Sequence, residues 1–387
     1  HIFSKLMLLI SCQCLLSIYG QIGKFFSNIK YFSQGGQILR ISISLSAILG
    51  IPVRVTNIRA GRSKPGLAAQ HLKGIQLVAT MCQAKMKGAN IGSTEIEFIP
   101  GKLRGGHYLA DTQTAGSISL LLQVALPCAL FADSGVTLDL RGGTNADMAP
   151  QIDYMERVFR NILKRFNADF NMNILRRGYF PKGGGHVRVK INPVRNISGV
   201  CLTERGHILE ITGTSFVAGT LPIKLAYLMA DGAKRELTSE HNVNIHSYKE
   251  DRHMAPDNCN GIILSCSSSS GCALGADALG RRGTDAADVG RVAAEALRAT
   301  LRTGACLDPH AQDQVILYMA LAEGRSCVRA GEVTLHTRTA IYILCQKVFQ
   351  AGSYVNCQNI VLFHPIWSIV FAASSHRNRY LLQKIKV

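Results

Sequence analysis

The sequence lacks the short motifs by which several large enzyme classes are recognised. There is no G-x-x-x-x-G-K-[ST] phosphate-binding loop and no G-x-G-x-x-G dinucleotide turn, so Walker-type ATP binding and Rossmann-type cofactor binding are not expected. The G-x-S-x-G elbow of one hydrolase class and the H-E-x-x-H helix of another are also missing. If the chain uses a nucleotide, the nucleotide must bind at a site of a different kind.

Zinc-binding pairs and a membrane span are missing as well. The 12 cysteines include no C-x-x-C pair, and no pair of histidines matches them, so nothing indicates a zinc finger. Several cysteines lie in apolar runs, which favours buried, reduced thiols and a reducing, intracellular compartment. The apolar run from Leu6 to Tyr19 resembles a signal-peptide core and is too short for a comfortable membrane span. We expect residues 1–33 to be an atypical segment, and we expect neither secretion nor a membrane partner.

Acidic residues are few in this chain. Only 25 Asp and Glu stand against 43 Lys and Arg, which gives a formal net charge of +18. Such an excess favours a polyanionic partner, because each phosphate that a cation neutralises releases condensed counterions. A basic protein without such a partner is the alternative that charge alone leaves open. The length of 387 residues and the hydrophobic content of 47% are typical of a folded protein with about two to three domain-sized units.

From about residue 34 the hydrophobic pattern alternates between strand-like and helix-like segments. The expected strands cover 52–58, 136–140, 186–191 and 333–335, and the expected helices cover 66–84, 115–131, 151–166, 285–301, 312–321 and 339–349. Thr284 is a plausible N-cap for the helix that follows it. This alternation predicts the α/β class, in the form of an α+β sandwich of sheets and helices.

Two observations bear on how the chain is divided. The words LRGGHYLAD (103–111) and LRGGTNAD (140–147) are similar, which indicates either a repeated unit or a chance recurrence of common turn residues. The stretch from 193 to 280 differs in texture, with polar loops and a serine-rich run. We therefore expect 193–280 to be an inserted module.

A few residues could carry chemistry, although each has a structural alternative. The segment 58–67 places Arg59, Arg62 and Lys64 between a strand and a helix, which suits a phosphate cradle or only a solvated loop. His336 could be a nucleophile or a general base, or a hydrogen-bonded structural histidine. Asp313 and the next residue could be a ligand pair or a polar helix start. The glycine-rich words at 34–40 and 179–185 are expected to be turns with a nearby cation.

Taken together and in order, several words resemble the RNA 3′-terminal phosphate cyclase family. They are GGQILR (35–40), IRAGRSKPGL (58–67), QHLKG (70–74), TAGSISLLLQ (114–123), GGTNADMAPQIDY (142–154), RRGYFPKGGGHV (176–187), LTERG (202–206), DQVILYMALA (313–322) and VTLHT (333–337). The resemblance covers residues 35–343 and is specific, because the words keep the family's order and spacing.

The resemblance implies a fold and an activity. The fold is a large domain of three repeated sheet-plus-two-helix units, here 34–192 plus 281–345, with a smaller inserted α/β domain at 193–280. Residues 346–387 are then an atypical C-terminal tail. The activity is the ATP-dependent conversion of an RNA 3′-terminal phosphate to a 2′,3′-cyclic phosphodiester, through a covalent histidine–AMP and an RNA–(3′)pp(5′)A intermediate. The implied partners are ATP, Mg²⁺ or Mn²⁺, and RNA with a 3′-phosphate end.

The resemblance also implies roles for individual residues. His336 matches the nucleophile, and Tyr154 matches a position where an aromatic ring could flank the adenine. The expected nucleotide-binding residues are Gln123, Pro150, His310, Asp313 and Gln314, and the expected phosphate- or RNA-binding residues are Arg40, Arg59, Arg62 and Lys64.

The chain departs from the family at two positions. Ser33 stands where the family has a Glu that helps to hold the metal, and His310 stands where Tyr is common. The metal ligands are therefore left open. The alternative function is a catalytically impaired, cyclase-like RNA-binding protein that acts in RNA processing or ribosome assembly. In either case we expect a nuclear or cytoplasmic protein, with protein partners left open.

Overall fold

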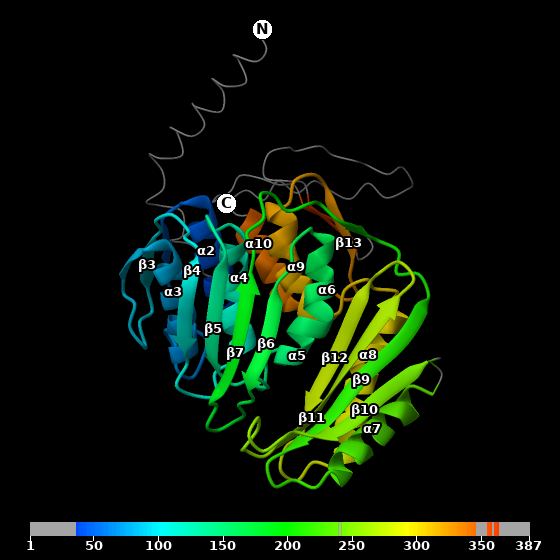
Figure 1. The fold of residues 1–387 in the computed structure, drawn as a ribbon. Helices are drawn as coiled ribbons and strands as arrows, with labels where there is room; N and C mark the ends of the chain where they lie inside the picture. The colour runs from blue at the N-terminus through cyan, green and yellow to red at the C-terminus, as the bar shows by residue number, and fades with distance from the viewer. Residues whose placement is uncertain (1–35, 239, 241, 346–353, 358–359, 364–387) are drawn as a thin grey trace.

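The computed structural model describes residues 36–238, 240, 242–345, 354–357 and 360–363, and these residues form a mixed α/β fold (Figure 1). Four small sheets are packed with helices, so the predicted fold class is confirmed. Among the described helices, none combines the length and the apolar character needed to cross a membrane. The threefold repetition of one unit and the domain limits stay predictions.

The first sheet is antiparallel, has the strand order β1-β3-β2 and packs beside two helices. Its elements are α2 (Gly36–Leu49), β1 (Val53–Val55), α3 (Ala69–Cys82), β2 (Lys85–Lys87) and β3 (Ile96–Ile99). Helix α2 is buried almost all round, because it packs against α3, α4 and α10. Gly36 allows this close packing, since a Cβ there would lie 1.9 Å from Nε2 of His71.

The second sheet has the strand order β4-β5-β7-β6, with β4 and β5 parallel and the other pairs antiparallel. Its elements are β4 (Gly106–Asp111), α4 (Ile118–Leu130), β5 (Val136–Gly142), α5 (Ile152–Tyr154), the π-helical turn η2 (Met155–Phe159), α6 (Arg160–Arg165), β6 (Asn171–Arg176) and β7 (Gly185–Ile191). One face of the sheet packs on α4 through alternate apolar residues such as Leu138 and Val189.

The third sheet has the strand order β14-β15-β13-β8 and shares a core with the first two sheets. Its elements are β8 (Cys201–Leu202), α9 (Pro309–Leu321), β13 (Ser326–Arg329), α10 (Leu335–Cys345), β14 (Tyr354–Cys357) and β15 (Ile360–Phe363). Strand β8 and helix α9 are far apart in sequence, because the fourth sheet lies between them along the chain. Helices α2, α4, α9 and α10 thereby meet in one apolar interior.

The fourth sheet has the strand order β10-β9-β11-β12 and a hydrophobic core of its own. Its elements are β9 (Ile208–Ala218), α7 (Lys224–Glu236), β10 (Val243–Lys249), β11 (Cys259–Ser268), β12 (Ala273–Leu279) and α8 (Ala286–Arg302). Helices α7 and α8 cross closely at two glycines. A Cβ at Gly290 would lie 1.8 Å from the Met229 carbonyl oxygen, and one at Gly232 would lie 2.1 Å from the Ala287 carbonyl oxygen. Helix α8 therefore packs with this sheet.

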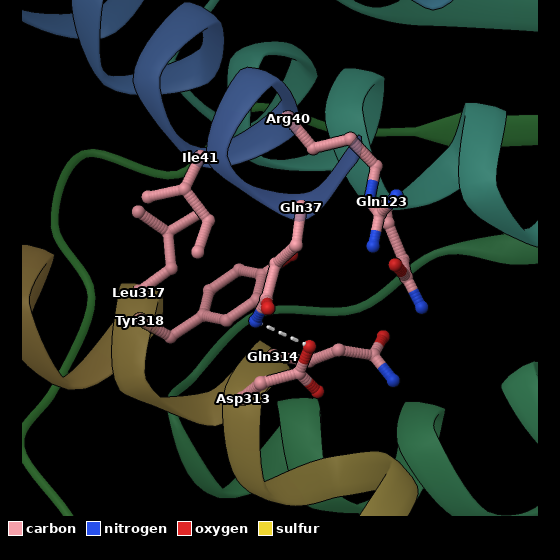
Figure 2. Close-up of a pocket in the computed structure, with 8 residues that line it drawn as sticks. All are labelled: Gln37, Arg40, Ile41, Gln123, Asp313, Gln314, Leu317 and Tyr318. Atoms are coloured by element: carbon pink, nitrogen blue, oxygen red, sulfur yellow. Dashed lines mark hydrogen bonds between the residues drawn. The ribbon is translucent and has the colours of Figure 1, made fainter. Parts of the chain in front are cut away.

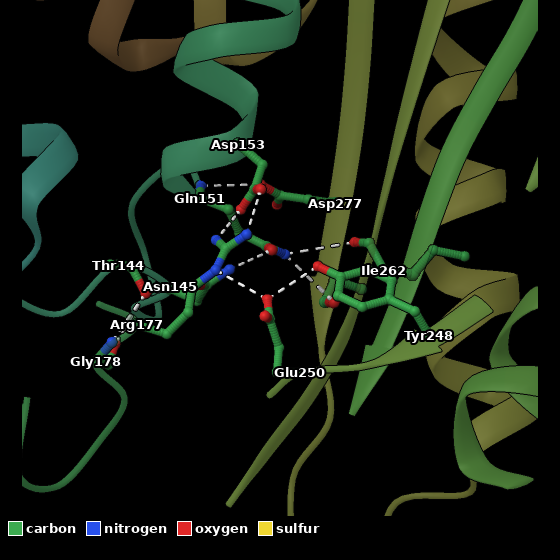
Figure 3. A network of polar contacts seen from close by, with 11 residues as sticks. Thr144, Asn145, Gln151, Asp153, Arg177, Gly178, Tyr248, Glu250, Ile262 and Asp277 are labelled. Carbon is green, nitrogen blue, oxygen red and sulfur yellow. Dashed lines mark hydrogen bonds and ion pairs between the residues drawn. The ribbon is translucent and has the colours of Figure 1, made fainter. Parts of the chain in front are cut away.

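A buried polar network joins the second sheet to the fourth (Figure 3). Arg177, which follows β6, donates to both carboxylate oxygens of Asp153 at 2.6 and 2.8 Å, and its Nε lies 2.9 Å from the Glu250 carboxylate. Burial alone would lower the pKa of Arg177, but the neighbouring carboxylates outweigh burial and raise it. Tyr248 completes the network by donating to Glu250 at 2.9 Å. Every charge in this network has an opposite charge beside it.

The structure corrects several sequence-based boundaries. Gly36 begins helix α2 instead of forming a turn, and the expected strand at 333–335 is absent, because helix α10 already begins at Leu335. Helix α9 begins at Pro309 instead of residue 312. The cap of α8 is Asp285, whose side chain accepts from the Ala287 amide, and not Thr284. The shifted starts of α8 and α9 are boundary errors, whereas the strand at 333–335 and the turn at 34–40 were assigned to the wrong kind of structure.

Candidate active site

Helix α9 is fixed at its start by a buried carboxylate. Asp308 is fully buried and accepts hydrogen bonds from the amides of His310 and Ala311 at 2.9 and 3.0 Å. It also accepts from the Tyr154 hydroxyl at 2.8 Å and from the Gly275 amide at 2.8 Å. One N-cap residue thus ties α9 to α5 and to β12 and sets the direction in which the first turn of α9 points.

His336 lies in the first turn of α10, and its backbone is held from two sides. Gln37 of α2 donates from Nε2 to the His336 carbonyl oxygen at 2.9 Å and to Asp313 Oδ2 at 2.7 Å. Thr334 caps the helix, because its hydroxyl accepts from the Thr337 amide at 3.1 Å. The side chain of His336 is 65% exposed, so a fixed backbone presents an accessible imidazole.

Gln312 of α9 holds the same turn through hydrogen bonds of its side chain. This glutamine is buried, and its Oε1 accepts from the Thr337 hydroxyl at 3.0 Å and from the Thr334 amide at 3.3 Å. Its Nε2 donates to the Glu332 carbonyl oxygen at 3.3 Å. Helix α9 therefore determines where the turn with His336 lies.

A pocket opens where α2, α4 and α9 meet (Figure 2). It is lined by Gln37, Arg40, Ile41, Gln123, Asp313, Gln314, Leu317 and Tyr318. Gln123, Asp313 and Gln314 were expected to bind the nucleotide and Arg40 to bind phosphate or RNA, and the structure brings these four together. His336 lies at its rim, with Nδ1 at 4.0 Å from Asp313 Oδ2.

The charged groups of this pocket are partly buried, and their charges are not fully compensated. Burial lowers the pKa of Arg40, and the charge of Asp313 offsets only part of that effect. In the described part of the chain no carboxylate forms an ion pair with Arg40. Burial raises the pKa of Asp313, while the positive charges of Arg40, His336 and His310 oppose the rise. A cation in this situation is prepared to receive an anionic ligand.

His310 and Pro150 lie toward β12 and not in this pocket. Nε2 of His310 is 3.7 Å from Asp277 Oδ1, and Pro150 precedes Gln151, whose amide donates to Asp277 Oδ2 at 3.1 Å. Burial would lower the pKa of His310, but Asp277 and further carboxylates outweigh burial and raise it to about 9. Tyr154 is fully buried and meets the His310 ring edge-on at 5.3 Å. Its hydroxyl donates to Asp308, the N-cap residue of α9.

The basic segment forms a closed loop between β1 and α3. Nη1 of Arg59 donates to the Gly66 carbonyl oxygen at 2.9 Å, and Gly66 has a positive φ of +83° and packs on Gly92, so a side chain would not fit there. Burial, together with the charges of Arg40 and Arg59, lowers the pKa of His71 to about 4. Arg40 and Arg59 therefore both lie near His71. The other two predicted cations of this segment are exposed and do not line the pocket: Arg62 and Lys64.

The described residues supply few groups that could hold a metal ion. No three His, Cys, Asp or Glu side chains among these residues are placed to hold a metal ion. Ser33, at the position where a metal-binding Glu was expected, lies outside the described residues. Asp313 is the only carboxylate that lines the Arg40 pocket.

Sequence reasoning missed four residues that shape the site, which are Gln37, Asp277, Asp308 and Gln312. Only Asp308 had a local signal, because an Asp followed by Pro before an apolar run is typical of an N-cap with Pro at the first helical position. The other three act through partners that are distant in sequence.

Comparison with known proteins agrees with this architecture. The family model described as RNA 3′-terminal phosphate cyclase matches residues 31–352. A protein of Pyrobaculum aerophilum named RNA 3′-terminal phosphate cyclase is 42% identical over 317 residues, which cover 82% of this chain and 90% of that protein. A protein of the same name from Drosophila melanogaster is 40% identical, over 81% of this chain and 88% of that protein. The chain therefore belongs to the RNA 3′-terminal phosphate cyclase family.

Proposed function

We propose that this protein converts an RNA 3′-terminal phosphate into a 2′,3′-cyclic phosphate at the expense of ATP, with His336 as the nucleophile. The observation that carries the proposal is the pocket beside His336, in which the half-buried Arg40 has an incomplete set of opposite charges. A nucleotide phosphate would supply the missing negative charge. The start of helix α10, which carries His336, adds its positive end to the same place.

In the first step, His336 attacks the α-phosphorus of ATP. Because Nδ1 faces Asp313, Nε2 is the nitrogen that is free to attack. An N–P bond forms, the bond from the α-phosphorus to the bridging oxygen breaks, and pyrophosphate leaves with the electron pair. Nδ1 keeps its proton, and the Asp313 carboxylate offsets the positive charge on the ring. Arg40 neutralises charge on the phosphates during the transfer.

In the next two steps, AMP is transferred to the RNA 3′-phosphate and is then released. An oxygen of the RNA 3′-phosphate attacks the phosphorus of histidine–AMP, the N–P bond breaks, and its electrons return to the imidazole. The neighbouring 2′-hydroxyl next attacks the RNA 3′-phosphorus and loses its proton to solvent. The bond to AMP breaks, and AMP leaves with a cyclic phosphate remaining on the RNA.

A divalent ion, Mg²⁺ or Mn²⁺, fits this site with one protein carboxylate. Mg²⁺ commonly keeps several waters and is held by one or two carboxylates together with substrate phosphates. Among the residues that line the pocket, Asp313 would be the protein ligand. When bound, such an ion neutralises phosphate charge.

Labelling with α-³²P-ATP tests the nucleophile directly. The purified protein is incubated with Mg²⁺ or Mn²⁺ beside His336→Ala, and the matched control is His253→Ala, which changes an exposed histidine in a distant loop. We expect acid-labile, base-stable label on the wild type and on the control, and none on His336→Ala. Label that survives in His336→Ala would reject this nucleophile. No label on a folded wild type with either metal would favour the impaired, RNA-binding alternative.

A further inference from the structure

The second sheet has one covered face and one open face. Leu138 and Val189 point into the core toward α4, whereas their neighbours Asp139 and Arg188 point the opposite way. In Figure 1 this second face is turned toward the viewer, and no helix lies in front of it. The sheet therefore presents a broad surface of its own, on the opposite side from the Arg40 pocket.

Basic side chains are concentrated on this open face. We call four of them the open-face cations: Arg141, Arg176, Arg188 and Lys190. Two histidines lie on the same face, His107 and His186, and so does Asp111, which pairs with Arg141. His186 of β7 lies in one cross-strand row with Arg141 of β5 and Arg176 of β6. A second row contains Arg188, and a third contains Lys190. The positive charge thus runs along β7 and across its neighbours.

One buried carboxylate anchors part of this surface. Asp139 accepts hydrogen bonds from His186 Nε2 at 2.7 Å and from Arg188 Nε at 3.0 Å, and it also contacts His107. Burial would raise the pKa of Asp139, but these hydrogen bonds outweigh burial and lower it. Asp139 therefore stays ionised and holds three basic groups in fixed positions on the sheet.

The remaining open-face cations are exposed. Arg141, Arg176 and Lys190 form no ion pair with any carboxylate in the described part of the chain. Alternate residues on a strand are about 6–7 Å apart, which is the scale of the distance between successive phosphates of a single nucleic acid strand. The alternate residues along β7, which are His186, Arg188 and Lys190, can therefore lie beside consecutive phosphates.

At Lys190, the line of alternate residues along β7 ends at a polar hollow of about 320 Å³. Its polar lining includes Lys164, Asn167, Asn171, Lys190 and Asn192. Its one acidic residue, Asp169, is already paired with Arg160 at 2.6 Å. Amide groups next to lysines suit the polar edge of a nucleobase and its phosphate. Lys190 belongs to both the hollow and the open-face cations, so the two features form one continuous surface.

We propose that this face docks the single-stranded RNA that precedes the reacting 3′ end. The inference rests on the proposed function, since it assigns a place to the body of the same substrate. An acidic protein segment is the other polyanion to consider. Such a segment has no nucleobase to fill the polar hollow beside Lys190, so we favour RNA. Because the pocket with Arg40 lies beyond the α4 layer, only RNAs of several nucleotides can occupy both places.

The test removes the three cations without charged partners by Arg141→Gln, Arg176→Gln and Lys190→Gln in one protein. The matched control removes the same charge from α7 by Lys224→Gln, Lys234→Gln and Arg235→Gln, which are also exposed. Affinity for a 3′-phosphorylated RNA of about 20 nucleotides is measured without ATP, by fluorescence anisotropy over a salt series. Three lost phosphate contacts should weaken binding by about tenfold or more and should lower the slope of log K against log salt by about 2. The α7 variant should bind as the wild type does.

Three further readouts separate this inference from the proposed function. Self-adenylation by ATP and cyclisation of an RNA of about three nucleotides should be unchanged in the open-face variant, because neither needs the sheet. Equal weakening by the α7 variant, or unchanged binding by the open-face variant, would overturn the inference. Displacement of the RNA by polyglutamate at equal charge concentration would also overturn it, in favour of a protein-docking surface. Failure of self-adenylation in the wild type would reject the proposed chemistry and leave the affinity result intact.

Discussion

Two arginines, one buried and one half-buried, show how differently this fold treats the same group. Arg177, between the second and fourth sheets, forms ion pairs with Asp153 and Glu250, and its pKa is raised (Figure 3). Arg40, in the pocket beside His336, forms no ion pair among the described residues, and its pKa is lowered by burial (Figure 2). Both side chains lose at least part of their hydration, but only Arg177 has carboxylates of the protein beside it in compensation.

The difference separates a structural joint from a ligand site. A buried charge that has all its partners holds its surroundings in one arrangement, and the loss of one partner leaves the others unpaired. A buried charge without partners costs folding free energy, which a bound anion can return. Arg177 should therefore matter for stability, and Arg40 should matter for nucleotide chemistry.

The largest effect is expected from Arg177→Ala. It leaves Asp153 and Glu250 buried without a cation, and we expect the free energy of unfolding to fall by about 3–5 kcal/mol. Denaturant unfolding measures the loss. The matched control is Arg54→Ala, which breaks an exposed ion pair with Glu95 and should cost no more than about 1 kcal/mol. Equal losses in the two variants would contradict the role of Arg177 as a joint.

The second effect concerns rate and leaves stability nearly unchanged. Arg40→Met keeps an unbranched apolar stem but removes the guanidinium charge, and we expect self-adenylation to slow by about 100-fold, as for loss of one electrostatic stabiliser of a transition state. Unfolding should shift by less than about 1 kcal/mol, because no ion pair is broken. The rate is measured by quenched labelling at saturating ATP. A large loss of stability with a normal rate would mean that Arg40, like Arg177, serves the stability of the fold and not nucleotide chemistry.

The smallest effect is a pH dependence at His310, which lies between the two regions. Its pKa of about 9 in the folded protein exceeds the ordinary value near 6.5, so its contribution to stability is fully present below 6.5. That contribution is lost as the pH rises from 6.5 through 9. Unfolding of the wild type and of His310→Gln at several pH values checks the sign. A stability difference between the two proteins that stays constant or grows toward pH 9 would contradict the ion pair with Asp277.

The sequence carried much of the fold but could not place helix α2. The segment from Ile41 to Ser46 alternates apolar residues with serine, which is typical of a strand. It is a helix because α3, α4 and α10 surround it, so that both kinds of residue are buried. Ser44 tolerates this burial because its hydroxyl donates to the carbonyl oxygens of Arg40 and Val124, each at 2.8 Å.

The candidate site was predictable to the extent that its residues lie within ordered sequence words. Gln123 and Asp313 were found in this way, and the structure brings them together. Gln37 lies in such a segment, GGQILR, and Gln312 does not, but neither was assigned a role, because their roles depend on which backbone atoms come within reach after folding. Pairing of this kind has no local signature, unlike the Asp–Pro start of α9.

The bonds of Gln37 join the two ends of the described chain. Its partners, Asp313 and His336, follow it by 276 and 299 positions. During synthesis on the ribosome, helix α2 emerges early and must wait for α9 and α10 before it can bury its apolar sides. A half-made chain therefore has no finished core around helix α2, and these contacts between distant segments form late in folding.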